Sequence, residues 1–231
     1  MNREGNTYTI VYAAVLVIVV AVLLAFTSES LKDRQNKNAE IDKKTQILQS
    51  IRVSSTSENA EELYGTYIAS SYIVLPTGEK TEGNAFAIDS EFEKEMKKPV
   101  SQRKLPVYEA NIDGSTKYII PLWGSGLWGP IWGYVALNDD KCTVYGATFG
   151  HKGETPGLGA EIDTDVFHKE FYDKKIAQNG KFTSIAVVKI GQAKAGIDHV
   201  DAISGGTITS QGVDAMLKNS IEPYKKFLEL E

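Results

Sequence analysis

Residues 117–137 read KYIIPLWGSGLWGPIWGYVAL, and this stretch decides between two classes of fold. Its centre, residues 124–129, matches the pattern G-x-G-x-x-G that marks many dinucleotide-binding domains. In those domains the glycines open a helix whose N-terminus receives the pyrophosphate. Here Pro130 and a second β-rich run, residues 131–137, follow the glycines, and no helical pattern is available. The stretch therefore argues against a dinucleotide-binding domain and predicts β-rich runs on both sides of a glycine-rich loop.

Further short β-rich runs lie outward from this stretch, separated by turn signals, and helical patterns lie toward the ends. The runs are TYIASSYIVL, NAFAI and VYEANI before the stretch, and CTVYGATFG and FTSIAVVKI after it. Residues 163–176 have a helical pattern, and residues 209–228 carry apolar side chains on one face, with Pro223 expected to kink or divide that helix. Residues 29–52 predict a helical stalk before the strands. Strands in the middle with helices at the ends predict an α+β domain on a stalk.

The N-terminal segment predicts a membrane-spanning helix. Residues 10–26, IVYAAVLVIVVAVLLAF, form an almost unbroken apolar run, and about 20 such residues cross a hydrocarbon core. The exit from this run, AFTSES, lacks the small-residue cleavage site of a secretory signal, so an uncleaved anchor is favoured. Charge leaves its orientation undecided, because Arg3 precedes the run and five basic residues follow it among acidic ones, namely Lys32, Arg34, Lys37, Lys43 and Lys44.

The composition indicates a folded domain and gives no sign of a metal or nucleic-acid site. The 231 residues are 42% hydrophobic with a net charge of −5, so no basic surface for a phosphate backbone is expected. The one cysteine, Cys142, excludes an intramolecular disulfide. The three histidines, His151, His168 and His199, have no metal-like spacing, so surface or core roles are expected for them. No P-loop pattern is present either.

Two polar loops are candidate ligand sites. Residues 150–159 read GHKGETPGLG, and glycines around one proline let a backbone approach a ligand closely, although such a loop is more often only a loop. Residues 200–210 read VDAISGGTITS and lead into the last predicted helix. A helix start offers unpaired N–H donors and a positive dipole end to a phosphate. An N-cap hydroxyl after a tight turn is the simpler interpretation of the letters SGGT alone.

Taken together, the apolar N-terminal helix, GETPGLG at residues 153–159 and DAISGGT at residues 201–207 resemble the FMN-binding family that includes NqrC, a component of the Na⁺-translocating NADH:quinone oxidoreductase. The resemblance covers nearly the whole chain, in motif order and spacing. RnfG, the corresponding component of the Rnf-type ferredoxin:NAD⁺ oxidoreductase, is a near relative with the same architecture and stays the alternative. The stretch WGSGLWGPIWGYVAL favours the quinone-reductase component.

The resemblance implies a site. In the family the last Thr of D-x-x-S-G-x-T carries FMN through a phosphoester bond, and that residue matches Thr207, with Asp201, Ser204 and Gly205 as the recognition pattern. The family usually has Ala where this chain has Gly206, which implies a looser loop. Further FMN contacts are implied for Ser204, Gly205, Gly206, Glu154, Thr155, Gly157, Leu158, Gly159, Trp128 and Lys189. The cation of Lys189 near the ring would favour reduced anionic flavin. No catalytic residue and no metal ligand are implied, since the Thr207 hydroxyl is only an attachment point.

The resemblance also implies a role and a setting. Such a protein relays electrons from an iron–sulfur centre toward the flavin of NqrB and quinone, and it is not catalytic alone. Its partners are the other proteins of a six-subunit complex, especially subunits B, D and E (NqrB, NqrD and NqrE), membrane lipid, and a flavin transferase that uses FAD. It crosses the bacterial inner membrane once, with the flavin domain on the periplasmic side. The expected division is an anchor at 1–28, a helical stalk at 29–60, and a β-rich FMN-binding domain with a C-terminal helix at 61–231.

Two interpretations of other classes stay open from the residues alone. An apolar N-terminal helix, a stalk and a β-rich head also describe a pilin-like structural protein. Residues 1–28, however, lack both the Gly-Phe cleavage site of pilins and the Glu within their apolar run. The other interpretation is a membrane-tethered flavin sensor or reductase that acts outside any complex.

Overall fold

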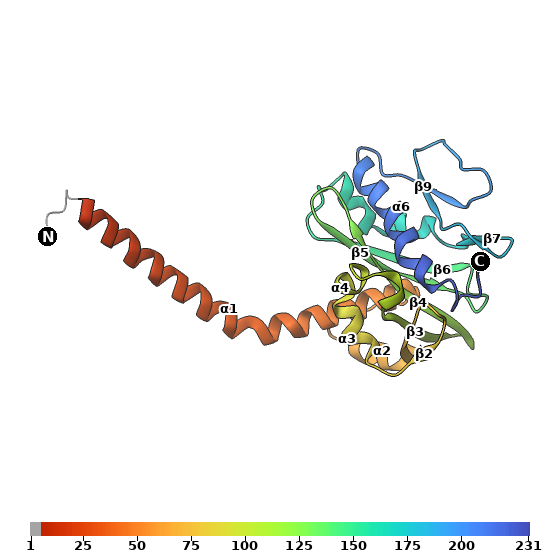
Figure 1. Ribbon diagram of the computed structural model, residues 1–231, viewed down its shortest axis with the longest axis horizontal. Helices are drawn as coiled ribbons and strands as arrows, with labels where there is room; N and C mark the ends of the chain where they lie inside the picture. The colour runs from red at the N-terminus through yellow and green to blue at the C-terminus, as the bar shows by residue number, and fades with distance from the viewer. Residues whose placement is uncertain (1–5) are drawn as a thin grey trace. The chain divides into compact units, whose positions relative to one another are not determined.

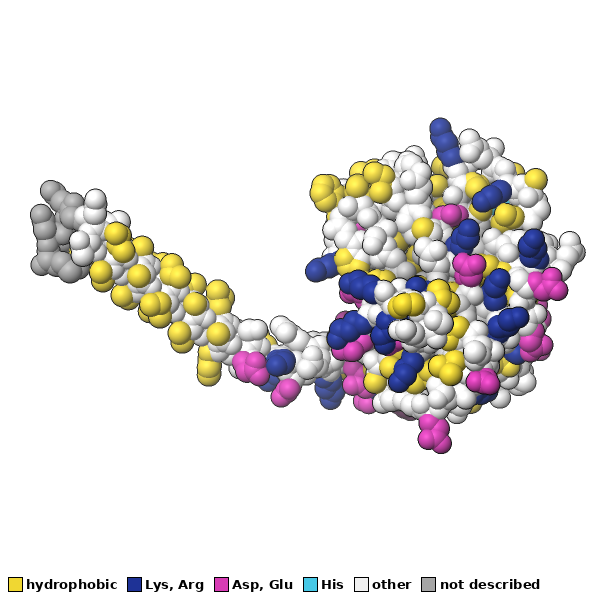
Figure 2. Space-filling view, in the orientation of Figure 1, with side chains coloured by type: hydrophobic (Ala, Val, Ile, Leu, Met, Phe, Trp, Pro, Cys, Tyr) yellow, Lys and Arg dark blue, Asp and Glu magenta, His cyan; other side chains and the backbone are white. Residues whose placement is uncertain are grey.

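The computed structural model describes residues 6–231, which form two compact units that divide between Lys43 and Lys44 (Figure 1). Most of helix α1 (Asn6–Ser50) belongs to the first unit, and its last residues belong to the second. The side chains of residues 10–26 are exposed, and Figure 2 shows them as yellow, apolar side chains along the helix. By length and composition α1 is apolar enough to cross a membrane, as predicted. Arg3 lies outside the described residues.

The second unit is built on an antiparallel sheet of six strands in the order β2-β1-β3-β4-β5-β6. The strands are β1 (Ile68–Val74), β2 (Lys80–Thr81), β3 (Leu105–Ile112), β4 (Ser115–Ser125), β5 (Pro130–Leu137) and β6 (Val144–His151). Asp113 and Gly114 join β3 to β4 with φ angles of 52° and 78°, the left-handed backbone that a two-residue hairpin needs. β4 and β5 pair in register around the glycine-rich loop. Residues 117–137 are therefore a hairpin, as predicted.

Helix α6 (Thr207–Ile221) covers one face of the sheet, as Figure 1 shows. Its apolar stripe packs into the main core against alternate residues of the central strands; these side chains include Val213, Met216, Leu217 and Ile221 on the helix and Val107, Ile120, Leu122 and Val135 on the sheet. The helix ends at Ile221, and the turn η3 (Glu222–Tyr224), which contains Pro223, follows it. There the buried Tyr224 hydroxyl donates to the carbonyl oxygen of Pro106 at 2.9 Å. Pro223 thus divides the predicted C-terminal helix.

The opposite face is covered by the end of α1 and by two short helices, α2 (Ala60–Tyr67) and α3 (Ala85–Ser90). Trp132 on β5 donates its Nε1–H to Gln46 Oε1 of α1 at 2.9 Å. Asp89 on α3 accepts hydrogen bonds from the Tyr108 and Tyr134 hydroxyls at 2.7 and 2.8 Å. These tyrosines point away from the α6 side because successive side chains of a strand alternate between faces. Both faces of the sheet are therefore buried.

One β-rich run was wrongly predicted. Residues 84–88, NAFAI, begin helix α3 and do not form a strand. The Asn84 side chain accepts a hydrogen bond from the Ala87 N–H at 3.0 Å, which caps the helix. Ala85 and Asp89 are the residues that α3 buries. The Asn84 cap is a local helix signal that the apolar, β-rich interpretation of this run did not take into account.

Two other segments are more broken than their patterns indicate. The helix predicted over residues 163–176 is limited to α5 (Asp165–Glu170), and Asp173 then turns the chain back with a φ of 63°. The run FTSIAVVKI is interrupted at Ser184, whose φ is 62°, and yields β8 and β9. The remaining short elements are α4 (Phe92–Met96), η1 (Val100–Gln102), η2 (Gly159–Asp163), β7 (Ala177–Gln178), β8 (Lys181–Phe182), β9 (Ala186–Val188) and β10 (His199–Asp201).

Candidate functional site

Three segments that are distant in sequence enclose a cavity of about 210 Å³ beside the tip of the β4–β5 hairpin. The hairpin tip contributes Leu127, the loop after β6 contributes four residues between 154 and 159, and residues 205–209 come from the start of α6. The two polar loops that stand out in the sequence, GETPGLG and SGGT, therefore meet at one place.

The start of α6 offers unpaired backbone donors to this cavity. Thr207 is the first residue of the helix, its side chain is exposed, and the preceding Gly206 provides no side-chain cap. The Ser210 N–H donates to the Gly206 carbonyl at 2.9 Å, which begins the helical hydrogen bonding. The N–H groups of residues 207–209 have no acceptor within the helix, and the helix N-terminus carries a partial positive charge. The arrangement suits an anion such as phosphate.

Glu154 ties the three segments together. Its side chain is buried, and the residue is only 4% exposed. Oε1 accepts from the Trp128 N–H at 2.8 Å, and Oε2 accepts from the Thr209 hydroxyl at 2.6 Å. In the described part of the chain no cation forms an ion pair with this carboxylate. Its two hydrogen bonds therefore hold the hairpin tip and the helix start in place.

Glycines bring the backbones of these segments close together. Gly205 has a φ of 73°, a left-handed backbone that favours glycine, and a Cβ there would displace the end of the Leu158 side chain, 2.6 Å away. A Cβ at Gly159 would lie 2.5 Å from Thr209 Oγ1. Gly206 differs, since a Cβ there would lie 3.1 Å from the Ile203 side chain. An alanine at that position would fit only if Ile203 shifted slightly.

Seven of the eleven residues expected at the site line the cavity, namely Thr207, Gly205, Gly206, Glu154, Thr155, Leu158 and Gly159. Ser204 and Gly157 line a neighbouring cavity of about 540 Å³ together with Asp201. Trp128 is joined to the site by its backbone, while the residue itself is 68% exposed. Lys189 is exposed and lines neither of these two cavities.

Three lining residues were missed by sequence reasoning: Leu127, Ile208 and Thr209. Leu127 and Ile208 are about half exposed and, with Leu158, form an apolar rim around the cavity. An apolar residue inside a glycine-rich loop was the available signal for Leu127. Thr209 had none, because its role depends on the distant Glu154. An exposed apolar rim beside an anion site suits a ligand with a flat apolar part and a phosphate.

Residues 126–222 match the family model described as the FMN-binding domain. This segment contains both polar loops and the uncapped start of α6, so the fold and the site together define an FMN-binding domain.

Relatives that match most of the chain identify the family within this class. NqrC of the Na⁺-translocating NADH-quinone reductase from Vibrio anguillarum is 33% identical over 230 residues, covering 92% of this chain and 89% of that protein. The crystal structure of the corresponding protein from Parabacteroides distasonis matches with a TM-score of 0.79 and 50% identity, covering 87% of this chain and 98% of that one. NqrC from Shewanella oneidensis, with a TM-score of 0.67, 24% identity and coverage of 83% and 97%, shows the fold alone.

The chain belongs to the NqrC family of the Na⁺-translocating NADH-quinone reductase. This membership confirms the predicted family and the predicted oxidoreductase class. The fold class is also confirmed, since a long apolar helix precedes a β-rich domain with a C-terminal helix.

Proposed function

We propose that this chain carries FMN in a Na⁺-translocating NADH-quinone reductase, with the FMN phosphate esterified to Thr207 Oγ1. In that role it relays electrons from an iron–sulfur centre toward the flavin of NqrB and quinone, and it has no substrate of its own. The observation that carries the proposal is the position of Thr207. Its exposed hydroxyl stands at the uncapped start of α6, in a cavity shared with the GETPGLG loop.

The residues around Thr207 fit the phosphate end of such a cofactor. The N–H groups of the first helical turn are unpaired donors that an anion can use. Gly159 and Gly205 keep the space beside them free of side chains. A cavity of about 210 Å³ suits the phosphate and part of the attached chain. The apolar rim of Leu127, Leu158 and Ile208 suits the isoalloxazine ring.

The flavin supplies the redox chemistry when bound, because it accepts and releases electrons singly as well as in pairs. The protein supplies attachment, since the ester at Thr207 keeps the cofactor from dissociating. Glu154 has both carboxylate oxygens engaged inside the protein, so we assign it to positioning the site. Lys189 remains a proposed source of positive potential near the ring, and Trp128 a proposed ring contact.

The setting follows from the same proposal. A flavin transferase forms the bond from Thr207 Oγ1 to the FMN phosphorus, while the pyrophosphate bond of FAD breaks and AMP leaves. The exposed hydroxyl suits this step. We place the anchor in the inner membrane and the flavin domain on the periplasmic side, beside NqrB, NqrD and NqrE. The boundaries at residues 28 and 60 stay predictions.

In-gel flavin fluorescence tests the attachment. The chain is coexpressed with a flavin transferase and denatured before electrophoresis, so that only covalently held flavin fluoresces with the band. We expect a fluorescent wild-type band and a dark Thr207→Ala band. Thr77→Ala is the matched control, because Thr77 is an exposed threonine that does not line the cavity. A dark wild-type band, or fluorescence that survives Thr207→Ala, would contradict the proposal.

A further inference from the structure

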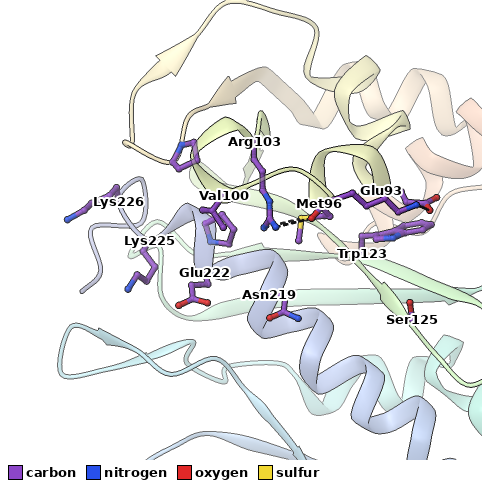
Figure 3. A pocket seen from close by; sticks show the side chains of 13 residues that line it. Glu93, Met96, Val100, Arg103, Trp123, Ser125, Asn219, Glu222, Lys225 and Lys226 are labelled. Atoms are coloured by element: carbon purple, nitrogen blue, oxygen red, sulfur yellow. Dashed lines mark hydrogen bonds and ion pairs between the residues drawn. The ribbon is translucent and has the colours of Figure 1, made fainter.

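A groove of about 780 Å³ lies on the second unit between α4, η1 and the C-terminal half of α6 (Figure 3). It shares no lining residue with the cavity at Thr207. The groove opens because β4 is longer than its neighbour. The register Tyr108↔Ile119 places the first residue of β3 opposite Leu122, so residues 123–125 of β4 have no β3 partner.

The groove carries a charge opposite to that of the chain. Four cationic and two anionic side chains line it, an excess of positive charge in a protein of net charge −5. Within the described residues Lys97 is neutralised by an ion pair with Glu93, whereas Lys225 and Lys226 have no ion pair. Positive potential is therefore concentrated where the chain leaves α6. Such a surface attracts acidic groups.

Arg103 is held in position without a carboxylate. Its Nε–H donates to the Lys98 carbonyl at 3.0 Å, and its Nη2–H donates to the Met96 carbonyl at 2.8 Å. Figure 3 shows the side chain extending into the groove between Met96 and Val100. Two backbone acceptors fix the guanidinium but leave its formal charge uncompensated. The Arg103 side chain is therefore already ordered before any ligand binds, so binding does not have to order it.

The lining of the groove also has an apolar part. Trp123 lies there, partly exposed and stacked on Trp132 with 6.4 Å between ring centroids and an interplanar angle of 14°. Ser220 Oγ on α6 forms hydrogen bonds with both the N–H and the carbonyl of Trp123, at 3.0 and 3.3 Å, which holds the backbone of Trp123 in place. Val100, 49% exposed, forms part of the wall. An aliphatic or aromatic side chain would find a rigid surface here.

We propose that this groove docks an acidic segment of another protein of the reductase complex. Carboxylates of that segment pair with Arg103, Lys225 and Lys226, and an apolar side chain of the segment packs on Trp123. A protein segment fits better than a lipid because the lining also includes Ser125 and Asn219. Their hydroxyl and amide offer hydrogen bonds along a peptide backbone. The proposal depends on family membership and is independent of flavin attachment at Thr207.

Site-specific photocrosslinking in the assembled complex tests the partner. Benzoylphenylalanine replaces Asn219, which is exposed and lines the groove, or Asp139, an exposed control in the β5–β6 turn. After irradiation of native membranes the complex is purified, and adducts are identified by mass spectrometry. We expect position 219 to crosslink to one other protein of the complex through a peptide rich in Asp and Glu, and position 139 not to do so. A phospholipid adduct, a non-acidic peptide, or equal crosslinking at both positions would overturn the proposal.

Charge reversal provides a second measurement. Lys225→Glu with Lys226→Glu should weaken retention of the chain in the purified complex about tenfold at low salt, and the difference should shrink as salt is raised. Lys174→Glu with Lys175→Glu is the adjacent-pair control outside the groove. Flavin fluorescence should be unchanged in both variants, because no groove residue lines the cavity at Thr207. Equal retention of both double variants would count against the proposal, whatever the flavin content.

Discussion

Replacing Glu154 by alanine removes a buried carboxylate that joins three segments of the flavin site. Its oxygens accept hydrogen bonds from the Trp128 N–H and the Thr209 hydroxyl, at 2.8 and 2.6 Å. A hydrogen bond to a charged group contributes about 1.5–3 kcal/mol. Burial of the carboxylate without an ion pair offsets part of the sum of two such bonds. We therefore expect Glu154→Ala to lower the free energy of unfolding by about 2–3 kcal/mol.

Thermal unfolding of the full chain in detergent, followed by circular dichroism, measures this loss. For a chain of this length it corresponds to a Tm lower by about 5–10 °C. Glu154→Gln is the matched control. Its amide oxygen accepts from the Trp128 N–H and its amide N–H donates to Thr209 Oγ1, so we expect a loss of about 1 kcal/mol or less.

Flavin loading reports whether the same bonds shape the site. Glu154→Ala should load FMN more slowly than the wild type although the Thr207 hydroxyl is intact, because the helix start has lost its connection to the hairpin tip. Glu154→Gln should load nearly as fast as the wild type. An alanine variant with unchanged Tm and unchanged loading would refute the reasoning. A glutamine variant as impaired as the alanine variant would show that the losses in Tm and loading do not come from these two hydrogen bonds.

Three further predictions concern packing, strand capping and pH. Gly159→Ala introduces a Cβ 2.5 Å from the buried Thr209 hydroxyl, so Tm and FMN loading should both fall. We expect the free energy of unfolding to decrease by about 1–3 kcal/mol. Gly153→Ala is the control and should match the wild type, because the space around Gly153 is open. Ser220→Ala removes the hydroxyl that bonds to both backbone groups of Trp123, and urea unfolding should show a loss of about 1–2 kcal/mol; an unshifted midpoint would contradict this. Burial lowers the pKa of His168, whose Nε2 accepts a backbone N–H at 3.1 Å. In the unfolded chain this histidine takes up a proton near pH 6.5, whereas in the folded chain it stays neutral at that pH. The free energy of unfolding therefore falls as the pH drops below about 6.5. His168→Gln should flatten the dependence of Tm on pH between about 7.5 and 5.5, and an unchanged slope would contradict the assignment.

The sequence predicts those parts of the fold that local physics determines. Asp113-Gly114 and Asn179-Gly180 are turn signals because both positions need left-handed backbone, and both pairs have it. Pro130 after the glycines excludes a helix at that point, and β5 begins there. The 3.6-residue period of the last helix likewise matches the stripe that α6 buries. These features depend on neighbours within a few residues.

The interior of the site depends on pairs that are far apart in the chain. Glu154 and Thr209 are 55 positions apart, and nothing in either motif alone indicates that one side chain binds the other. The family resemblance predicts Glu154 as a flavin contact, whereas the structure shows its oxygens occupied within the protein. NAFAI shows the opposite limit, because the short apolar run suggested a strand while the local cap by Asn84 marks the start of a helix.

The last turns of α1 also bear on how soluble fragments should be cut. Ile47 and Leu48 are fully buried, and Gln46 accepts a hydrogen bond from Trp132. A fragment that starts at residue 61 would lose both apolar side chains, worth about 3–6 kcal/mol of burial together, and yet keep every residue proposed to touch FMN. Failure of such a fragment to hold flavin would report a damaged scaffold. Spectroscopic work on the isolated domain therefore needs a start upstream of Gln46.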